Sequence, residues 1–175
     1  MDHYLETERL ILRPFDQEDI EPSYQMNLDA EVSRYTGDGG VVSREEVAHR
    51  IQENVLGDYR KHGFGRFAVE LKGGPRFIGF AGLKYLPDWK EVDLGYRFMQ
   101  DYWGQGLATE AGRACLKFGF ETLHLSKIIA MALPENEGSV RVLQKLNFQF
   151  EKEILEEGDL VHVFQLFNPD STDSQ

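Results

Sequence analysis

Two glycines at the start of an expected helix are the residues of this chain best suited to bind an anion. Gly104 and Gly106 lie in the segment 100–111, between an apolar strand-like run and a helical pattern. Glycine lets the backbone approach a ligand closely, and the first N–H groups of a helix have no intrahelical partner. The segment therefore favours binding of a phosphate, with a plain tight turn as the alternative interpretation.

Two familiar phosphate-binding loops do not fit these residues. A Walker loop requires a lysine before the Ser or Thr at the start of the helix, and the segment Leu107-Ala108-Thr109 contains none. A dinucleotide-binding fingerprint requires a third glycine where Thr109 stands, within alternating strands and helices that are not indicated upstream.

The pattern Trp103-x-x-Gly106-x-Ala108 resembles the Arg/Gln-x-x-Gly-x-Gly/Ala signature of the GNAT superfamily of acetyl-CoA-dependent N-acetyltransferases, with Trp103 in place of the usual first residue. The longer string 102–111 is similar to the branch that contains the ribosomal-protein N-terminal (RimJ/RimL-like) acetyltransferases. Further resemblances to that branch follow in the right order at 7–14, 93–96 and 136–148. Together they cover the chain up to about Phe167.

This resemblance implies that acetyl-CoA is the acyl donor. Its pyrophosphate would rest on main-chain N–H groups of the glycine segment, which need no cationic side chain, and its pantetheine arm would pair with the preceding strand. The residues expected to contact the donor are Phe98, Met99, Trp103, Gly104, Gln105, Gly106, Leu107, Ala108, Thr109 and Asn136.

The proton transfers of acetylation have few candidate residues. Many GNAT enzymes carry a tyrosine that protonates the leaving thiolate at the position where this chain has Leu143. In the ribosomal branch, a serine at the position of Ser139 is the proposed substitute for that tyrosine. A role of Ser139 at the end of a helix is the alternative. Glu91 and Asp93 point to the same side of one expected strand and could remove the amine proton or attract an ammonium, although a solvated strand face is the plainer interpretation.

The composition restricts the partners. The 175-residue chain has a net charge of −11, which would repel nucleic acids and anionic membranes and attract cationic amines, or simply keep the surface hydrated. No membrane-length apolar run and no secretory signal are visible, so a cytoplasmic location is expected. Cys115, the sole cysteine, is expected to be buried and not nucleophilic. The histidines show no metal-ligand spacing, so no metal is expected.

The element pattern predicts a mixed α+β fold. A strand at 9–13 precedes two helices, which begin at Asp16 and Ser43 and are joined by a glycine-rich loop at 34–40. Three antiparallel strands follow, and the rest is helix, strand, helix and hairpin; these expected ranges are 67–71, 77–83, 91–99, 106–122, 127–133, 139–146, 148–155 and 161–166. A single domain is expected at 1–167, with a disordered tail at 168–175.

The resemblance sharpens this fold to a three-layer arrangement, with helices on both faces of a mainly antiparallel sheet and a splayed parallel pair of strands. The predicted function is acetyl transfer to a primary amine of a small molecule or peptide, by direct attack in a ternary complex. A dedicated ribosomal-protein N-terminal acetyltransferase and a non-catalytic acyl-CoA-binding module are the alternatives. The acceptor and the oligomeric state, including a homodimer, stay open.

Overall fold

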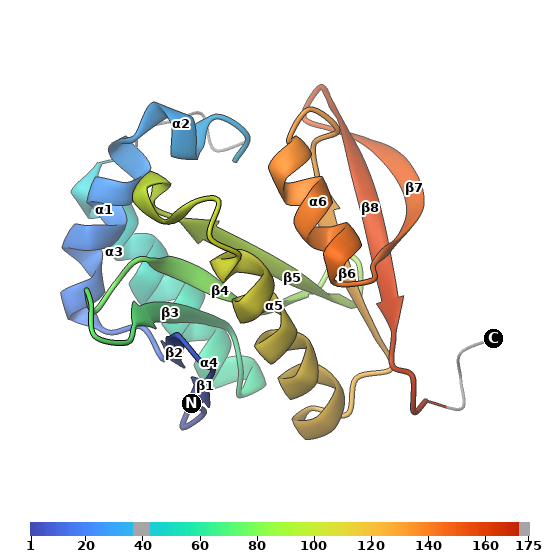
Figure 1. Ribbon diagram of the computed structural model, residues 1–175, viewed down its shortest axis with the longest axis horizontal. Coiled ribbons are helices and arrows are strands. Elements are labelled where there is room, and N and C mark those ends of the chain that lie inside the picture. Colours follow the sequence, from blue (N-terminus) through green and yellow to red (C-terminus); the bar gives the residue numbers. More distant parts are fainter. Residues whose placement is uncertain (37–42, 172–175) are drawn as a thin grey trace.

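The computed structural model describes residues 1–36 and 43–171 (Figure 1). Within these residues the strands form one sheet in the order β1-β2-β3-β4-β5-β6-β8-β7. Neighbouring strands are antiparallel except β5 and β6, which run parallel. This confirms the expected mixed sheet. The strands are β1 (Leu5–Glu6), β2 (Leu10–Arg13), β3 (Arg66–Leu71), β4 (Gly79–Leu86), β5 (Glu91–Phe98), β6 (Lys127–Ala132), β7 (Gln149–Glu156) and β8 (Asp159–Phe167).

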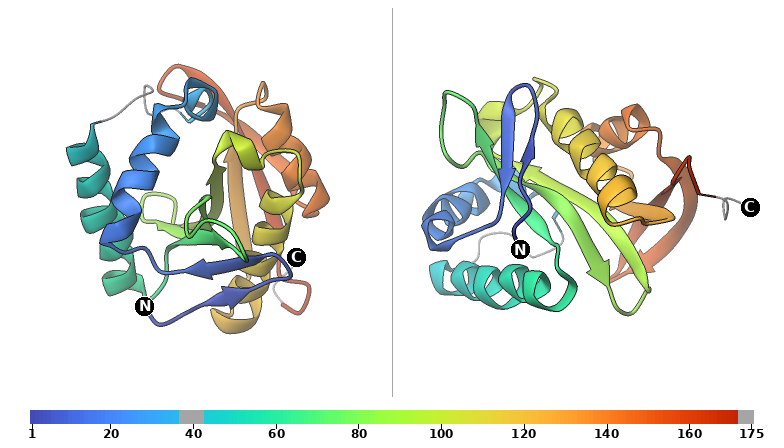
Figure 2. Two further views of the ribbon diagram at one scale, coloured as in Figure 1. Left: turned by 60° about the vertical axis from the view of Figure 1, so that its left-hand side comes forward. Right: turned by 90° about the horizontal axis from the view of Figure 1, so that it is seen from below.

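Helices lie on both faces of the sheet (Figure 2). The α-helices of the described residues are α1 (Ile20–Leu28), α2 (Ala30–Ser33), α3 (Arg44–His49), α4 (Leu56–His62), α5 (Leu107–Lys117) and α6 (Glu137–Lys145). On one face, Ala111 of α5 and Leu143 of α6 belong to the same buried cluster as Leu94 of β5. On the other face, Met26 of α1 and Val47 of α3 pack with a second cluster. The sheet is therefore the middle of three layers.

The signals for helix starts are confirmed at both expected positions. The Asp16 side chain accepts a hydrogen bond from the Glu18 N–H in a capping box that begins the 3₁₀ turn η1 (Gln17–Asp19), and α1 follows it. The Ser43 hydroxyl accepts from the Glu46 N–H at 3.1 Å and begins α3. Between α3 and α4 the helix passes through a π-helical turn, η2 (Arg50–Val55), and it ends at Gly63, whose φ of 78° suits a residue without Cβ.

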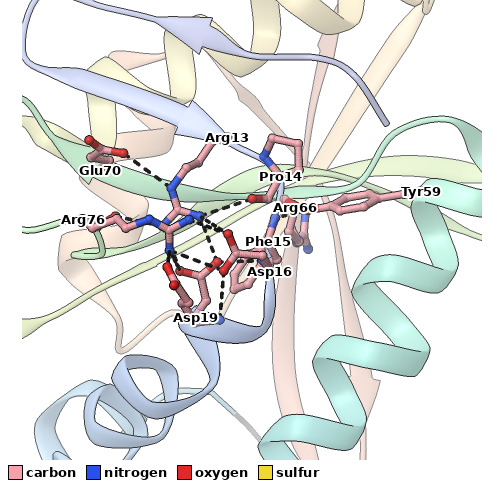
Figure 3. A network of polar contacts seen from close by, with 10 residues as sticks. Arg13, Pro14, Phe15, Asp16, Asp19, Tyr59, Arg66, Glu70 and Arg76 are labelled. Atoms are coloured by element: carbon pink, nitrogen blue, oxygen red, sulfur yellow. Dashed lines mark hydrogen bonds and ion pairs between the residues drawn. The ribbon is translucent and has the colours of Figure 1, made fainter.

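A buried ion pair fixes the start of the first helix to the sheet (Figure 3). The guanidinium of Arg13 on β2 donates to both carboxylate oxygens of Asp19, at 2.8 and 2.9 Å, and the Asp19 side chain is fully buried. Arg76 donates to Asp16 and, at 3.3 Å, to Asp19. The network satisfies a carboxylate that would be costly to bury alone.

Short elements escaped the sequence pattern. β1 has two residues and α2 has four, too few for a periodicity to show. The expected strand at 77–83 begins only at Gly79, and the expected helix at 106–122 is α5 followed by the π-helical turn η4 (Phe118–Thr122). The glycines at 37–40 lie outside the described residues.

The C-terminal segment is held at its first residue to the loop that precedes β6. The N–H of Asn168 donates to the Ser126 carbonyl at 2.9 Å, and its side-chain amide donates to the Leu125 carbonyl at 3.0 Å. Residues 172–175 of the expected tail are not among the described residues. In the described part of the chain, no helix has the length and apolar character needed to cross a membrane.

Candidate active site at the separation of strands β5 and β6

The parallel strands β5 and β6 share one bridge pair, Asp93 with Ile129, among the described residues. Figure 1 shows the two strands diverging from each other. The Met99 N–H donates to the Ile78 carbonyl at 2.9 Å, on the side of β5 that pairs with β4. Because main-chain groups alternate in direction along a strand, those of residues 96 and 98 point to the opposite side, toward β6. We call this stretch of β5 beyond Asp93, together with the facing part of β6, the β5–β6 separation. It offers hydrogen-bonding groups outside the ladder.

The glycine segment lies immediately after β5. Gly104 and Gly106 have φ angles of 74° and 78°, a conformation that favours glycine, and Gly106 is the N-cap of α5. No side chain caps α5, so its first N–H groups are not satisfied within the helix. A Cβ on Gly104 would meet no atom within 4 Å. The expected turn is therefore an open, uncapped helix start.

The residues next to these glycines in the sequence offer a ligand main-chain groups more than side chains. Leu107 and Thr109 are 2% and 8% exposed, because their side chains turn into the core, while Ala108 is half-buried. The Gln105 amide donates to the Asp101 carbonyl at 3.2 Å. A phosphate on this segment would therefore meet mainly N–H groups.

A cationic side chain that the sequence reasoning missed lies against the segment. Arg9 donates to the Gln105 carbonyl at 2.9 Å and forms an ion pair with Glu110 of α5 at 2.7 Å. Glu110 also accepts from the Thr7 hydroxyl at 2.6 Å. Burial acts to raise the pKa of Glu110, but the hydrogen bonds from Thr7 and Arg9 outweigh burial and lower it. Arg9 thus brings a half-exposed guanidinium beside the uncapped helix.

Trp103 and Met99 lie beside the separation with their polar groups already paired. The Trp103 indole N–H donates to the Phe98 carbonyl at 2.8 Å, and the Met99 N–H donates to the carbonyl of Ile78, the residue before β4. Of the main-chain groups expected near 98 and 99, the Phe98 N–H is the one directed toward β6. The hydrogen bond from Trp103 to the Phe98 carbonyl holds the end of β5 in place.

On the other side of the separation, Asn136 and Ser139 begin α6. The Asn136 side chain accepts from the Ser139 N–H at 3.2 Å, so Asn136 is the helix cap. The Ser139 hydroxyl is not part of that cap. It lies 3.0 Å from the phenol oxygen of Tyr96 on β5.

Tyr96 is a second site residue that the sequence reasoning missed. Its burial raises the pKa of the phenol to about 12, against a smaller lowering by the hydrogen bond with Ser139. Leu143, at the position of the usual tyrosine, is 1% exposed in the core. Tyr96 lies within the strand motif 93–96, but nothing in that motif indicates a partner so far along the chain.

Glu91 and Asp93 both form ion pairs. Asp93 accepts from the Arg66 guanidinium of β3 at 3.0 Å, and Glu91 accepts from Lys127 of β6 at 3.1 Å. All four side chains are mostly shielded from solvent. Each carboxylate is therefore partly neutralised, and neither lies in the stretch of β5 beyond Asp93 that forms the β5–β6 separation.

Two further observations bear on the chemistry. Cys115 is buried, and burial raises the pKa of its thiol to about 12, so it is not an available nucleophile. Within residues 1–36 and 43–171, no three His, Cys, Asp or Glu side chains are grouped closely enough to hold a metal ion.

Comparisons with known proteins agree with this arrangement. The family model described as "Acetyltransferase (GNAT) domain" matches residues 9–149. An uncharacterized N-acetyltransferase of Bacillus subtilis, YoaA, is 33% identical over 148 residues, which are 84% of this chain and 83% of that protein. The spermidine N(1)-acetyltransferase of Escherichia coli K12 is 29% identical over 150 residues, which are 83% of this chain and 76% of that protein.

Solved structures share the fold. A GNAT-family acetyltransferase from Bacillus anthracis superposes with a TM-score of 0.80 at 27% identity, covering 95% of this chain and 99% of that chain. RimL, a ribosomal L7/L12 α-N-protein acetyltransferase solved with coenzyme A, gives a TM-score of 0.79 at 18% identity over 94% of this chain and 98% of that chain, which shows a shared fold alone. On the family match, the chain belongs to the GNAT family of acetyltransferases.

Proposed function

We propose that this protein transfers the acetyl group of acetyl-CoA directly to a primary amine of a small molecule or a peptide. The observation that carries the proposal is the β5–β6 separation, which has the uncapped start of α5 at one end and the contact between Tyr96 and Ser139 across it. Binding of donor and acceptor together replaces a bimolecular encounter by an oriented reaction.

The donor would bind through groups that the fold leaves available. Its pyrophosphate suits the N–H groups of residues 104–109, with the Arg9 guanidinium beside them. Its pantetheine amides suit the main-chain groups of Tyr96 and the Phe98 N–H, which point toward β6. Asn136, at the start of α6, would adjoin the same arm.

The transfer balances without an acyl-enzyme. The amine nitrogen attacks the thioester carbon, the C–N bond forms and the C–S bond breaks, with its electron pair staying on sulfur. Ser139 gives its hydroxyl proton to the sulfur and regains a proton from the attacking nitrogen through water. A main-chain N–H on β5 would stabilise the oxygen of the intermediate. The buried Cys115 thiol takes no part.

We propose that the acceptor is cationic, because the protein carries a negative net charge. The chain carries a net charge of −11, and one relative is a spermidine acetyltransferase. Amines with a pKa near ~10 are mostly protonated at neutral pH, so a proton must leave before attack. Glu91 and Asp93 are the proposed acceptors of that proton or attractors of the ammonium, through carboxylates that already face Lys127 and Arg66.

A panel screen that follows thiol release from acetyl-CoA tests the proposal. Small amines, polyamines and peptides with free N-termini are offered at fixed acetyl-CoA. Turnover with amines supports acetyl transfer, and turnover confined to extended peptides with the N-terminal sequences of ribosomal proteins points to that dedicated activity. Saturable binding of acetyl-CoA with no turnover across the panel would leave a non-catalytic acyl-CoA-binding module.

A further inference from the structure

Tyr96 and Ser139 form a polar contact that joins the two sides of the β5–β6 separation. Tyr96 belongs to β5, three residues beyond the Asp93–Ile129 bridge, and Ser139 belongs to the first turn of α6, the helix that follows β6. Their oxygens are 3.0 Å apart, although 43 residues separate them in the sequence. The contact is therefore located where β5 and β6 no longer pair with each other.

The Tyr96 phenol is suited to donate a hydrogen bond and not to ionise. Burial raises its pKa to about 12, so the O–H stays protonated at neutral pH. The phenol O–H can donate to the Ser139 carbonyl, 3.2 Å away, or to the Ser139 hydroxyl oxygen, 3.0 Å away. The carbonyl lies in the first turn of α6, where the N–H four residues on can satisfy it. The carbonyl keeps a second lone pair, so both oxygens can accept from the phenol, and the hydroxyl oxygen is the nearer of the two.

The Ser139 hydroxyl has one proton, and the direction of the contact decides where that proton points. If Tyr96 donates to the Ser139 oxygen, the serine proton is free to point at another acceptor. If Ser139 donates to Tyr96, the serine proton is already used. The two arrangements predict opposite effects when the phenol hydroxyl is removed.

We infer that Tyr96 is a positioning residue, which donates to the Ser139 oxygen and so directs the serine proton toward the thioester sulfur. The inference rests on the proposed acetyl transfer. The hydrogen bond fixes the serine rotor in the productive orientation and makes its O–H a stronger donor, because successive hydrogen bonds polarise one another. The sulfur receives its proton from Ser139, and Tyr96 keeps its own.

Tyr96→Phe removes the phenol oxygen and keeps the ring. We expect kcat to fall by roughly tenfold, the effect of losing one hydrogen bond in the transition state, with the KM for acetyl-CoA nearly unchanged. In a Ser139→Ala background the same substitution should add nothing, because its effect passes through the serine. An unchanged or increased kcat in the single variant, or additive losses in the double variant, overturns the inference.

Tyr59→Phe is the matched control. The Tyr59 side chain is buried, and its hydroxyl accepts from the Phe15 N–H at 3.1 Å and donates to the Arg66 carbonyl, in the network at the start of α1 (Figure 3). We expect this variant to lose stability and keep kcat. A fall in kcat that matches that of Tyr96→Phe would mean that general loosening explains both, and the inference fails.

A binding measurement separates this inference from the proposed function. Coenzyme A is titrated onto the protein and the pKa of its bound thiol is followed by thiolate absorbance. A serine proton directed at sulfur favours the thiolate, so the pKa of the thiol should be lowest in the parent and higher in Tyr96→Phe and Ser139→Ala. Equal values in all three overturn the inference even if amines are acetylated. Absence of coenzyme A binding overturns the proposed function, and the inference with it.

Discussion

The guanidinium of Arg66 lies directly over Gly95. A Cβ at position 95 would meet the Arg66 Nη2 atom at 2.5 Å, and the same atom donates to Asp93 at 3.0 Å. Gly95→Ala should therefore displace Arg66 and weaken its ion pair with Asp93, at a cost of about 1–3 kcal/mol. Gly79→Ala should cost more, because its Cβ would lie 2.2 Å from the Arg97 carbonyl and its φ is 156°. Urea unfolding of both variants measures the difference, and a smaller loss for Gly79→Ala would contradict the packing argument.

Gly106→Val tests the phosphate segment. Acetyl-CoA should raise the melting temperature of the parent, because it binds the folded chain. The variant should lose most of that rise, because the side chain narrows the approach to the start of α5 and disfavours the φ of 78°. Gly158→Val, with a φ of 90° in the β7–β8 turn, is the control for backbone strain. Equal acetyl-CoA stabilisation in Gly106→Val and the parent would remove the segment from the binding site.

Ser139→Ala separates chemistry from helix capping. The cap bond of α6 uses the Ser139 main-chain N–H, which alanine keeps. Stability should therefore be kept, while loss of the hydroxyl proton should lower turnover by about 10²-fold with little change in acetyl-CoA affinity. Retained turnover would limit Ser139 to a structural role.

Cys115→Ala is the companion variant in the same assay. Direct transfer to the amine needs no protein thiol, and Cys115 is buried, so turnover should be retained once folding has been verified. Lost turnover in a well-folded Cys115→Ala variant would reopen a route through an acyl-enzyme.

The acceptor preference should depend on salt. With a net charge of −11, the protein should favour cationic amines over neutral or acidic analogues in kcat/KM. The advantage should shrink as salt rises, because the screening length is only ~10 Å at 0.1 M. A preference for an acidic acceptor that ignores salt would refute the proposed charge class.

Glu110 should make part of the stability depend on pH. Its pKa is lowered in the folded chain, so its contribution is present above the unfolded value of about 4.3 and is lost as the pH falls through the folded value. Glu110→Gln should remove this contribution. The difference in unfolding free energy between the parent and Glu110→Gln should therefore narrow as the pH falls through the folded pKa of Glu110. A difference that stays constant with pH would contradict this prediction.

Features carried by neighbouring residues could be predicted from the sequence. The caps at Asp16 and Ser43, the antiparallel meander and the glycine turn each depend on a few adjacent residues. The Asp93 and Glu91 carboxylates were correctly placed on one strand, but the cations that neutralise them come from other strands.

The missed site contacts join residues that are distant in the sequence. Arg9 meets Glu110 across 101 residues, Tyr96 meets Ser139 across 43, and Arg66 meets Asp93 across 27. No periodicity records such pairs, because they arise only when the strands are ordered in the sheet. The family motifs contained Arg9, Tyr96 and Ser139 without indicating that any two of them touch.

The edge strand β7 affects whether the sheet can pair with strands of other molecules. It is one edge of the sheet, and its register with β8 shifts between Phe150 and Lys152. Charged residues at 151–153 flank that bulge. A kinked edge that carries charge is a poor template for strand addition, which blocks the open-ended stacking that exposed apolar edges invite. Phe150, Leu155 and Leu160 of this hairpin are exposed, and the bulge and the charges disfavour the pairing of this apolar edge with another strand.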